Sequence, residues 1–316
     1  MCPATAGPTS PADGQRRRRY PSDTTDTEWA LLEPLLPSPA CTRAAGGRPE
    51  AHPRREVVDA IRYLVHNGCV WRALPADFPP WRTVYGFFAR WAANGTLGRV
   101  HDQLREQVRV AAGRHPQPSA AIIDSQSVRA ADTVPKQSRG FDAAKKVNGR
   151  KRHLAVDTLG LLLVVLVTAA SVQDRDGARP LLWRLRVAQR RLRLAWADAA
   201  YAGKLVVWAA AALGLRVEIV RRRLAHAFKV LPRRWVVERT FAWISRHRRT
   251  VRDYERLPDH HQAMVTWAMI TVMTRRLARQ HRPARTQHQP SPGQHDRTFR
   301  SGRDGGCGVS TGLTAT

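Results

Sequence analysis

The sequence predicts a mixed α/β fold, a sheet flanked by helices, preceded by a small all-helical N-terminal domain. The chain has 316 residues, of which 43% are hydrophobic, enough for a core and for about two domains. Up to residue 112 apolar residues recur at helical spacing, whereas short apolar strands alternate with helical segments from residue 119. We therefore expect a helical domain at residues 23–112 and an α/β domain at 119–278.

The composition of the two ends predicts disorder. Residues 1–22 form a leader rich in Pro, Ser, Thr and Arg, and residues 279–316 form a tail with few apolar residues. No apolar segment follows the basic cluster Arg16–Arg19, so no signal peptide is expected, and the longest apolar run is too short to span a bilayer. The 4 cysteines are scattered without CxxC spacing, which predicts a cytoplasmic protein without a zinc site or disulfide framework.

Four helices are expected in the first domain. Thr25 and Glu28 have capping-box spacing and begin a helix that Pro34 disturbs. The other three are Arg54–Asn67, Trp81–Asn94 and a segment near Leu97–Ala112. Helix, connection, helix is the outline of a helix-turn-helix DNA reader, although an ordinary helical bundle has the same pattern. As a reader, the second helix would present four side chains to DNA: Arg82, Thr83, Tyr85 and Arg90.

The second domain is expected to mix strands and helices. Its first strand, Ala120–Ile123, ends at Asp124, and a turn at Thr158–Gly160 joins two strands of a hairpin. In chain order the remaining elements are the hairpin strands His153–Asp157 and Leu161–Ala169, helix Asp176–Gln189, strand Arg193–Ala197, helix Lys204–Leu213, strand Val217–Val220 and helix Trp235–Arg248.

Three acids stand where these elements can bring them together. Asp124 and Asp198 each follow a strand, and carboxylates at the ends of neighbouring strands converge at one sheet edge. Glu238 lies on a helix expected to pack against the sheet. Hard divalent cations take oxygen ligands, and two Mg²⁺ or Mn²⁺ ions can activate a nucleophile and stabilise the leaving 3′-oxygen in phosphodiester cleavage. The three acids are therefore candidate catalytic metal ligands.

Each of these acids also has an ordinary structural interpretation. In chain order these are the N-cap of a helix, a turn residue after a strand, and the partner of Arg234 or Arg239. Three further acids compete for the metal site: Asp157, Asp174 and Asp176. The first is better explained as a turn former and the other two as helix-capping residues.

The charge of the chain indicates a polyanionic partner. Lys and Arg number 53 against 25 Asp and Glu, a formal net charge of +28, which favours nucleic acid over a membrane surface because no amphipathic anchor is visible. A biased genomic composition is the alternative source of the arginines. The basic segment near the site is a candidate phosphate-gripping loop or a solvated charge run: Lys136, Arg139, Lys145, Lys146, Arg150, Lys151 and Arg152. Beside Glu238, the candidate DNA contacts are Arg233, Arg234 and Arg239, whereas Trp235 and Trp243 are expected in the core.

Three segments resemble the acidic motifs of DDE transposases of the IS5 family, within the wider IS4-type group. They are Ile123–Val128 (IDSQSV), Trp196–Gly203 (WADAAYAG) and Arg234–Trp243 (RWVVERTFAW), and Tyr20–Asp23 and Asn67–Arg72 resemble the family's N-terminal region. The resemblance covers roughly residues 20–278. Ala199 and Ala200 stand where the family usually has glycines, and Leu231 and Ser245 occupy its tyrosine and lysine positions.

The resemblance implies an RNase H-like fold and two-metal catalysis by Asp124, Asp198 and Glu238. It also implies double-stranded DNA partners, the terminal inverted repeats and the target, and a homodimer on DNA. The leading hypothesis is an insertion-sequence transposase that cleaves and joins DNA at the bacterial nucleoid. The alternatives are a catalytically inactive DNA-binding protein derived from a transposase, and another RNase H-like nuclease.

Overall fold

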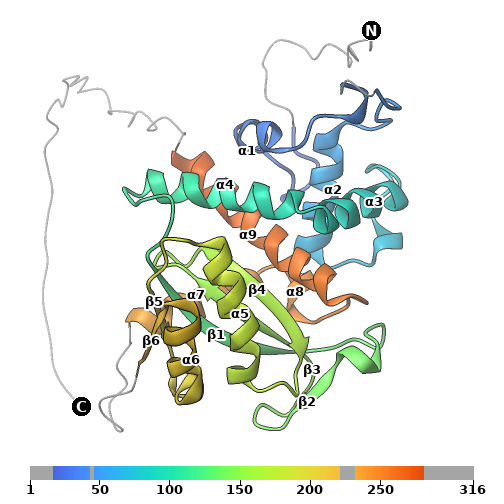
Figure 1. Cartoon of the computed structure of the whole chain (residues 1–316). Coiled ribbons are helices and arrows are strands. Elements are labelled where there is room, and N and C mark those ends of the chain that lie inside the picture. Colours follow the sequence, from blue (N-terminus) through green and yellow to red (C-terminus); the bar gives the residue numbers. More distant parts are fainter. Residues whose placement is uncertain (1–16, 43–45, 221–231, 281–316) are drawn as a thin grey trace, which may run out of the picture. The chain divides into compact units, whose positions relative to one another are not determined.

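A helical N-terminal region and a six-stranded sheet make up the described chain (Figure 1). The computed structural model describes residues 17–42, 46–220 and 232–280. Its first helices are α1 (Asp26–Leu32), α2 (Arg54–Asn67), α3 (Trp81–Ala93) and α4 (Thr96–Ala111), with short 3-10 turns η1 (Glu33–Leu35), η2 (Ala40–Thr42) and η3 (Trp71–Ala73). These helices confirm the sequence expectation closely. Most of the expected leader and tail, residues 1–16 and 281–316, lies outside the described residues.

The order of the chain begins earlier than its composition indicated. We expected a disordered leader to residue 22, but Tyr20 packs its ring 4.6 Å from that of Tyr63 and 5.2 Å from that of Phe78. The backbone N–H of Arg19 donates to Asp23 at 2.9 Å. Aromatic packing of a single residue therefore outweighs the polar composition around it.

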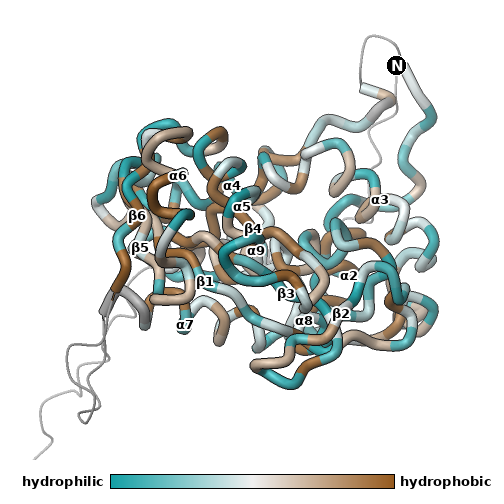
Figure 2. Tube along the Cα trace, turned by 60° about the horizontal axis from the view of Figure 1, so that its bottom comes forward, coloured by the Kyte–Doolittle hydropathy of each residue, from teal (hydrophilic) through white to brown (hydrophobic). Residues whose placement is uncertain are grey.

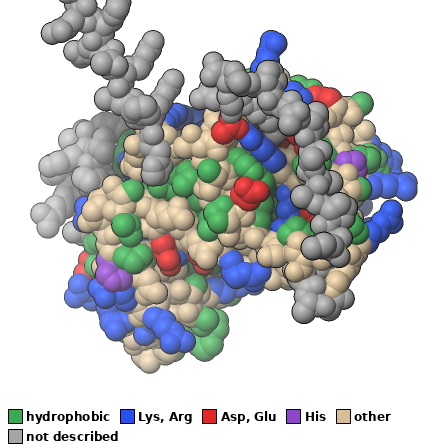
Figure 3. Space-filling view, turned by 90° about the horizontal axis from the view of Figure 1, so that it is seen from above, with side chains coloured by type: hydrophobic (Ala, Val, Ile, Leu, Met, Phe, Trp, Pro, Cys, Tyr) green, Lys and Arg blue, Asp and Glu red, His purple; other side chains and the backbone are tan. Residues whose placement is uncertain are grey.

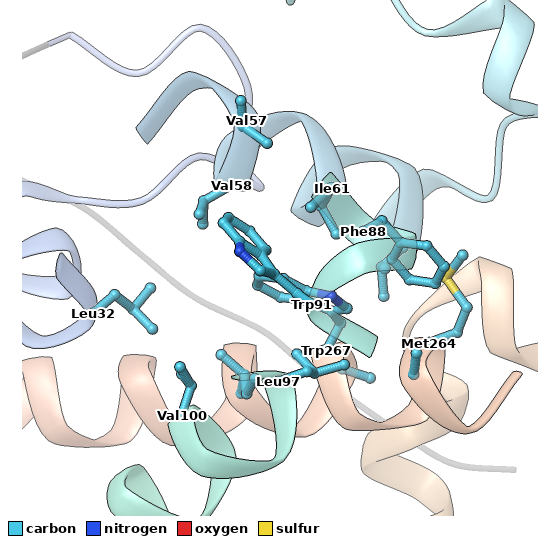
Figure 4. Close-up of a cluster of buried hydrophobic side chains, with 14 of the residues drawn as sticks. Leu32, Val57, Val58, Ile61, Phe88, Trp91, Leu97, Val100, Met264 and Trp267 are labelled. Atoms are coloured by element: carbon cyan, nitrogen blue, oxygen red, sulfur yellow. The ribbon is translucent and has the colours of Figure 1, made fainter. Parts of the chain in front are cut away.

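The helical core needs a partner from the far end of the chain. Helix α9 (Pro258–Gln280), which the sequence reading did not anticipate, supplies Met264 and Trp267 to the cluster that contains Leu32, Ile61 and Trp91 (Figure 4). The rings of Trp91 and Trp267 lie 6.2 Å apart. Helix α9 also packs against strand β4 of the sheet. It therefore contributes to the core of the helical region and to the core on one face of the sheet.

The sheet mixes parallel and antiparallel strands, as predicted. Its strands are β1 (Ala120–Arg129), β2 (Gly140–Asp142), β3 (Val147–Val156), β4 (Leu162–Ala169), β5 (Leu194–Ala197) and β6 (Arg216–Ile219). The order is β2-β3-β1-β5-β6, with β4 also paired to β3. The hairpin is confirmed as β3 and β4, while β1–β5 and β5–β6 are parallel. Strand β1 does not end at Asp124 but continues to Arg129, because polar side chains that follow the acid find partners inside the protein.

Helices cover both faces of this sheet. In Figure 1 the helices α5 (Asp174–Ala188) and α6 (Lys204–Leu213) lie in front of it, and their apolar side chains pack on Ile123 and Ala155. Helix α7 (Pro232–Ser245) packs with α9 on the opposite face, against Ile122 and Leu154. Neighbouring residues of one strand thus enter different cores on the two faces of the sheet. Figure 2 shows hydrophobic stretches along the strands β3 and β4 of this sheet. This is the expected mixed sheet flanked by helices.

Three short connecting elements complete the described chain. The short helix α8 (Arg248–Val251) leads from α7 to α9, and the 3-10 turns η4 (Lys136–Ser138) and η5 (Ala199–Tyr201) follow β1 and β5. No helix in the described ranges is long and apolar enough to cross a membrane.

Candidate active site

Asp124 lies on β1, and Asp198 directly follows the adjacent parallel strand β5, so that both face the same side of the sheet. Ile122 of β1 pairs with Trp196 of β5, and each aspartate lies two residues further along its chain. Because side chains alternate between the faces of a strand, each aspartate shares the face of its strand neighbour, and both neighbours pack beneath α7. Consistent with this, both acids line one small pocket together with Val237 of α7.

Backbone amides orient the two carboxylates. The N–H of Ser125 donates to Asp124 Oδ1 at 2.7 Å, and the N–H of Ala200 donates to Asp198 Oδ1 at 2.9 Å. Asp198 is thus also the cap of η5, in agreement with its interpretation as a turn residue after a strand. An ionised carboxylate has about four acceptor positions, so this local bond is compatible with a metal-binding role.

Tyr201 packs in the core that contains α5 and α6, within the electrostatic influence of three aspartates. The Tyr201 side chain is buried, and burial raises its pKa well above the usual value. The negative charges of Asp124, Asp174 and Asp198 raise that pKa further. Lys151 neutralises Asp174 at 2.9 Å, whereas Asp124 and Asp198 are oxygen donors of the kind that suits Mg²⁺ or Mn²⁺.

Glu238 lies beside this pocket, on α7. Its neighbour Val237 is buried and lines the pocket, and Phe241 and Ile244 continue the sheet-packed side of the helix. The Glu238 side chain itself is exposed. Within the described ranges, no three His, Cys, Asp or Glu side chains are close enough to hold one metal ion. The structure therefore brings two of the predicted acids together and leaves the third on the adjoining helix.

The basic segment at 136–152 is mostly a hairpin rather than a loop. Strands β2 and β3 occupy residues 140–142 and 147–156, and Lys145 and Lys146 lie in the turn between them. Both lysines are exposed, and Lys145 Nζ lies 3.4 Å from the carbonyl oxygen of Ser125, the residue after Asp124. Lys145 thus lies close to the strand segment that carries Asp124, and Lys146 follows it in the same exposed turn.

The next three basic residues, Arg150, Lys151 and Arg152, are buried. The expectation that they contact DNA phosphates is therefore wrong. Arg150 is 0% exposed and pairs with Asp253 at 3.0 Å. Arg152, 1% exposed, donates to the carbonyl of Thr250 at 2.9 Å. Lys151 is 5% exposed and is bound to acids inside the protein. Their charges are taken up by internal partners, so we omit them from the DNA-contacting surface.

The candidate DNA-reading helix α3 presents only part of its predicted set outward. Arg82 and Arg90 are exposed, whereas the Tyr85 ring packs 5.1 Å from that of Trp71 and 5.8 Å from that of His260. The connection from α2 to α3 runs from Gly68 to Pro80, longer than the short turn of a helix-turn-helix. The arginines keep their predicted role as an expectation, and Tyr85 is chiefly a packing residue.

Among the arginines of α7, the structure describes the side chain of Arg239. Arg239 is stacked between Trp235 and Trp243, 4.8 Å from each ring centre, and donates to the carbonyl of Leu159 at 3.0 Å. Trp235 is 45% exposed, so it is less buried than expected. The side chains of Arg233 and Arg234, like residue Leu231, lie outside what the structure describes.

Two of the three competing acids, Asp157 and Asp174, have structural partners. Asp157 is fully buried, pairs with Arg109, and accepts the N–H of Leu161 at 2.8 Å, which confirms it as a turn former. Asp174 accepts the hydroxyl of Ser125 at 2.7 Å, and Asp176 is exposed on α5. Sequence reasoning missed the bond between Asp174 and Ser125, since nothing in the local pattern links residues so far apart.

Comparison with known proteins gives matches to two protein families and to two proteins of one insertion element. Residues 24–101 match the family described as "Putative transposase of IS4/5 family", and residues 115–273 match the "Transposase DDE domain". The chain is 31% identical over 151 residues to the "Putative transposase for insertion sequence element IS402" of Burkholderia cepacia, covering 46% of this chain and 69% of that protein. It is also 32% identical over 111 residues to an uncharacterized 16.2 kDa protein of the IS402 element from the same organism, covering 33% of this chain and 71% of that protein.

A mixed sheet with helices on both faces and a matching DDE domain define an insertion-sequence transposase of RNase H-like fold. Within this class, the chain belongs to the IS4/IS5-type DDE transposases.

Proposed function

We propose that the protein cleaves DNA strands at the ends of an insertion sequence and joins the freed 3′ ends to target DNA. Asp124, Asp198 and Glu238 are the proposed catalytic residues. The observation that carries the proposal is the shared pocket of Asp124 and Asp198 beneath α7, the helix of Glu238. Because the Glu238 side chain is exposed, it can turn toward the pocket without disturbing the core.

The three carboxylates are the donors for two Mg²⁺ or Mn²⁺ ions. When bound, such ions activate the attacking oxygen and stabilise the leaving 3′-oxygen. The protein's own residues supply oxygen ligands of the right hardness. Hydrogen bonds from the backbone N–H groups of Ser125 and Ala200 hold the carboxylates of Asp124 and Asp198 in place. Lys145 contributes a positive charge beside Ser125 that can hold the phosphate of the cleaved strand.

The proposed DNA surface combines exposed basic residues of the helical region and the hairpin turn. On the face seen in Figure 3, Lys and Arg side chains gather at two places on the rim, with Asp and Glu side chains at single positions between them. We assign Arg82 and Arg90 of α3 to the terminal inverted repeats and Lys145 and Lys146 to the strand being cleaved. We assign Arg233, Arg234 and Arg239 of α7 to further contacts with DNA. Because both ends of an element must be cleaved, the working assembly is a homodimer on DNA.

Single substitutions of the three acids test the proposal. A duplex made from the DNA that flanks the coding region is incubated with protein and Mg²⁺, and nicking and gel retardation are measured on the same duplex. Asp124→Asn, Asp198→Asn and Glu238→Gln should each abolish nicking and retain DNA binding. Asp176→Asn, a neutralised exposed acid on α5, is the matched control and should nick normally.

The two alternatives give different results in the same assay. A DNA-binding protein without catalysis retards the duplex but never nicks it with Mg²⁺ or Mn²⁺. A nuclease of another kind nicks DNA lacking the element's ends equally well. Retained nicking in Asp198→Asn would remove that residue from the mechanism.

A further inference from the structure

A second polar cluster lies directly behind Asp124, on the α5-facing side of β1. Ser125 donates its hydroxyl to Asp174 at 2.7 Å, and Ser127 donates its hydroxyl to Asp142 at 2.6 Å. Lys151 lies between the two acids, with its ammonium 2.9 Å from Asp174 and 3.4 Å from Asp142. One lysine thus joins two Ser–Asp pairs; we call these five residues the Lys151 cluster.

The register of the sheet explains why the cluster forms. Ser127 pairs with Lys151 across β1 and β3, so both side chains point to the same face. Asp124, one residue before Ser125, points to the opposite face and into the pocket. The cluster therefore restrains one face of the β1 segment whose opposite face carries Asp124.

Lys151 is fully committed to this cluster. An ammonium group has three donor hydrogens, and Lys151 has three acceptors: the two aspartates and the carbonyl of Val172 at 2.9 Å. It is 5% exposed, and Asp142 and Ser125 are each 7% exposed. A charge so enclosed and satisfied has no donor to offer to DNA. The residue that the sequence suggested as a phosphate contact has another task.

We propose that Lys151 is a positioning residue for the catalytic carboxylate of Asp124. By holding Asp142 and Asp174 it fixes Ser125 and Ser127, and through them the backbone that carries Asp124. The cluster spans β1, β2, β3 and the first turn of α5, so four elements restrain this one segment. A metal ligand must stay close to its productive position. Residues that hold the ligand in place without touching the metal commonly change metal affinity or activity. The inference rests on the proposed role of Asp124.

The test is Lys151→Met, which removes the ammonium and keeps much of the side chain's length. Three quantities are measured: single-turnover nicking at saturating DNA and Mg²⁺, the affinity for Mn²⁺ alone by calorimetry without DNA, and duplex affinity as a function of salt. We expect nicking or Mn²⁺ affinity to fall about 10- to 100-fold. Duplex affinity and its salt slope should stay unchanged, whereas loss of a phosphate contact would weaken binding and reduce the slope by about 1.

Lys145→Met is the matched control, because Lys145 is exposed in the neighbouring turn. It should show the opposite pattern, weaker duplex binding with a smaller salt slope and unchanged Mn²⁺ affinity. If Lys151→Met behaves like Lys145→Met, Lys151 is a DNA contact and the proposal is wrong. If Lys151→Met lowers only the thermal midpoint and leaves Mn²⁺ affinity and nicking at wild-type levels, its role is structural and the proposal is equally wrong.

Milder variants keep the proposal testable if Lys151→Met does not fold. Ser125→Ala and Ser127→Ala each remove one hydroxyl, and each should lower Mn²⁺ affinity with unchanged duplex binding. Lys151→Met combined with Asp174→Asn neutralises the uncompensated acid and should recover part of the lost Mn²⁺ affinity, which a phosphate contact would not do. If Asp124→Asn also nicks normally, the proposed function has failed. If only the Lys151 cluster variants nick normally, the positioning role alone is rejected.

Discussion

The buried pair of Arg109 and Asp157 offers a quantitative test of how the helical region is joined to the sheet. Arg109 lies on α4, and Asp157 follows β3 at the hairpin turn; the two side chains form an ion pair and are 5% and 0% exposed. The other carboxylate oxygen accepts the N–H of Leu159 at 2.9 Å and of Leu161 at 2.8 Å. One side chain thus closes a turn and neutralises a buried charge.

Asp157→Ala removes both functions at once. Breaking a buried ion pair by deleting one partner costs about 3–5 kcal/mol, because the remaining charge stays buried without compensation. Asp157→Asn keeps an oxygen for the two amides, so it should cost less than Asp157→Ala, although it still leaves the Arg109 charge without its counter-charge. In Arg109→Met with Asp157→Asn no charge is left unpaired, so this double variant should be more stable than the sum of the single losses predicts.

Urea unfolding followed by circular dichroism measures these free energies, and Asp176→Asn on the surface is the control, expected within about 0.5 kcal/mol of the wild type. A loss below about 1 kcal/mol for Asp157→Ala would refute the argument from burial. Nicking provides a separate check. A folded Asp157→Asn protein should nick DNA normally, and loss of nicking would return Asp157 to the list of metal ligands.

Three further predictions concern the cores and the buried charges. Trp267→Ala should lower the free energy of unfolding by about 3–5 kcal/mol in urea, because the ring is 2% exposed in the helical core; a smaller loss would mean that the site collapses around the gap. Burial lowers the pKa of His247 from 6.5 to about 4, so the unfolded chain binds a proton more readily between these values. Stability from this residue is present above pH 6.5 and lost as the pH falls toward 4, about 3 kcal/mol in all, and His247→Gln should flatten that part of the urea-midpoint profile. Arg150→Met should cost about 3–5 kcal/mol, and adding Asp253→Asn should restore part of it; an additive result would contradict direct pairing.

Elements with strong local patterns could be predicted from the sequence. Helix α2 has a clear apolar stripe and a glycine with φ of 76° at its end, and the β3–β4 hairpin surrounds an Asp-Thr-Leu-Gly turn. Helix α9 was missed because it is buried on several sides, so its apolar residues follow no single stripe. Strand β1 was read too short because Ser125 and Ser127 are polar, and only the folded structure supplies their partners.

The residues of the candidate site also fall into those that the sequence could predict and those that it could not. Asp124 and Asp198 could be recognised since each follows an apolar strand, and parallel pairing then places them together. The basic residues could not be sorted by local pattern, because Arg150 owes its burial to Asp253, about a hundred residues later. Register between distant strands, which local sequence does not encode, decides whether a lysine meets solvent or an aspartate.

The position of α9 has a consequence for the order in which the protein can mature during synthesis. The side chains of Met264 and Trp267 complete a core whose other walls come mainly from α1 to α4. Until α9 has been synthesised, these earlier helices keep an apolar surface uncovered, and such nascent intermediates are prone to aggregate. Synthesis through α9 is thus required before the region proposed to read DNA ends becomes stable.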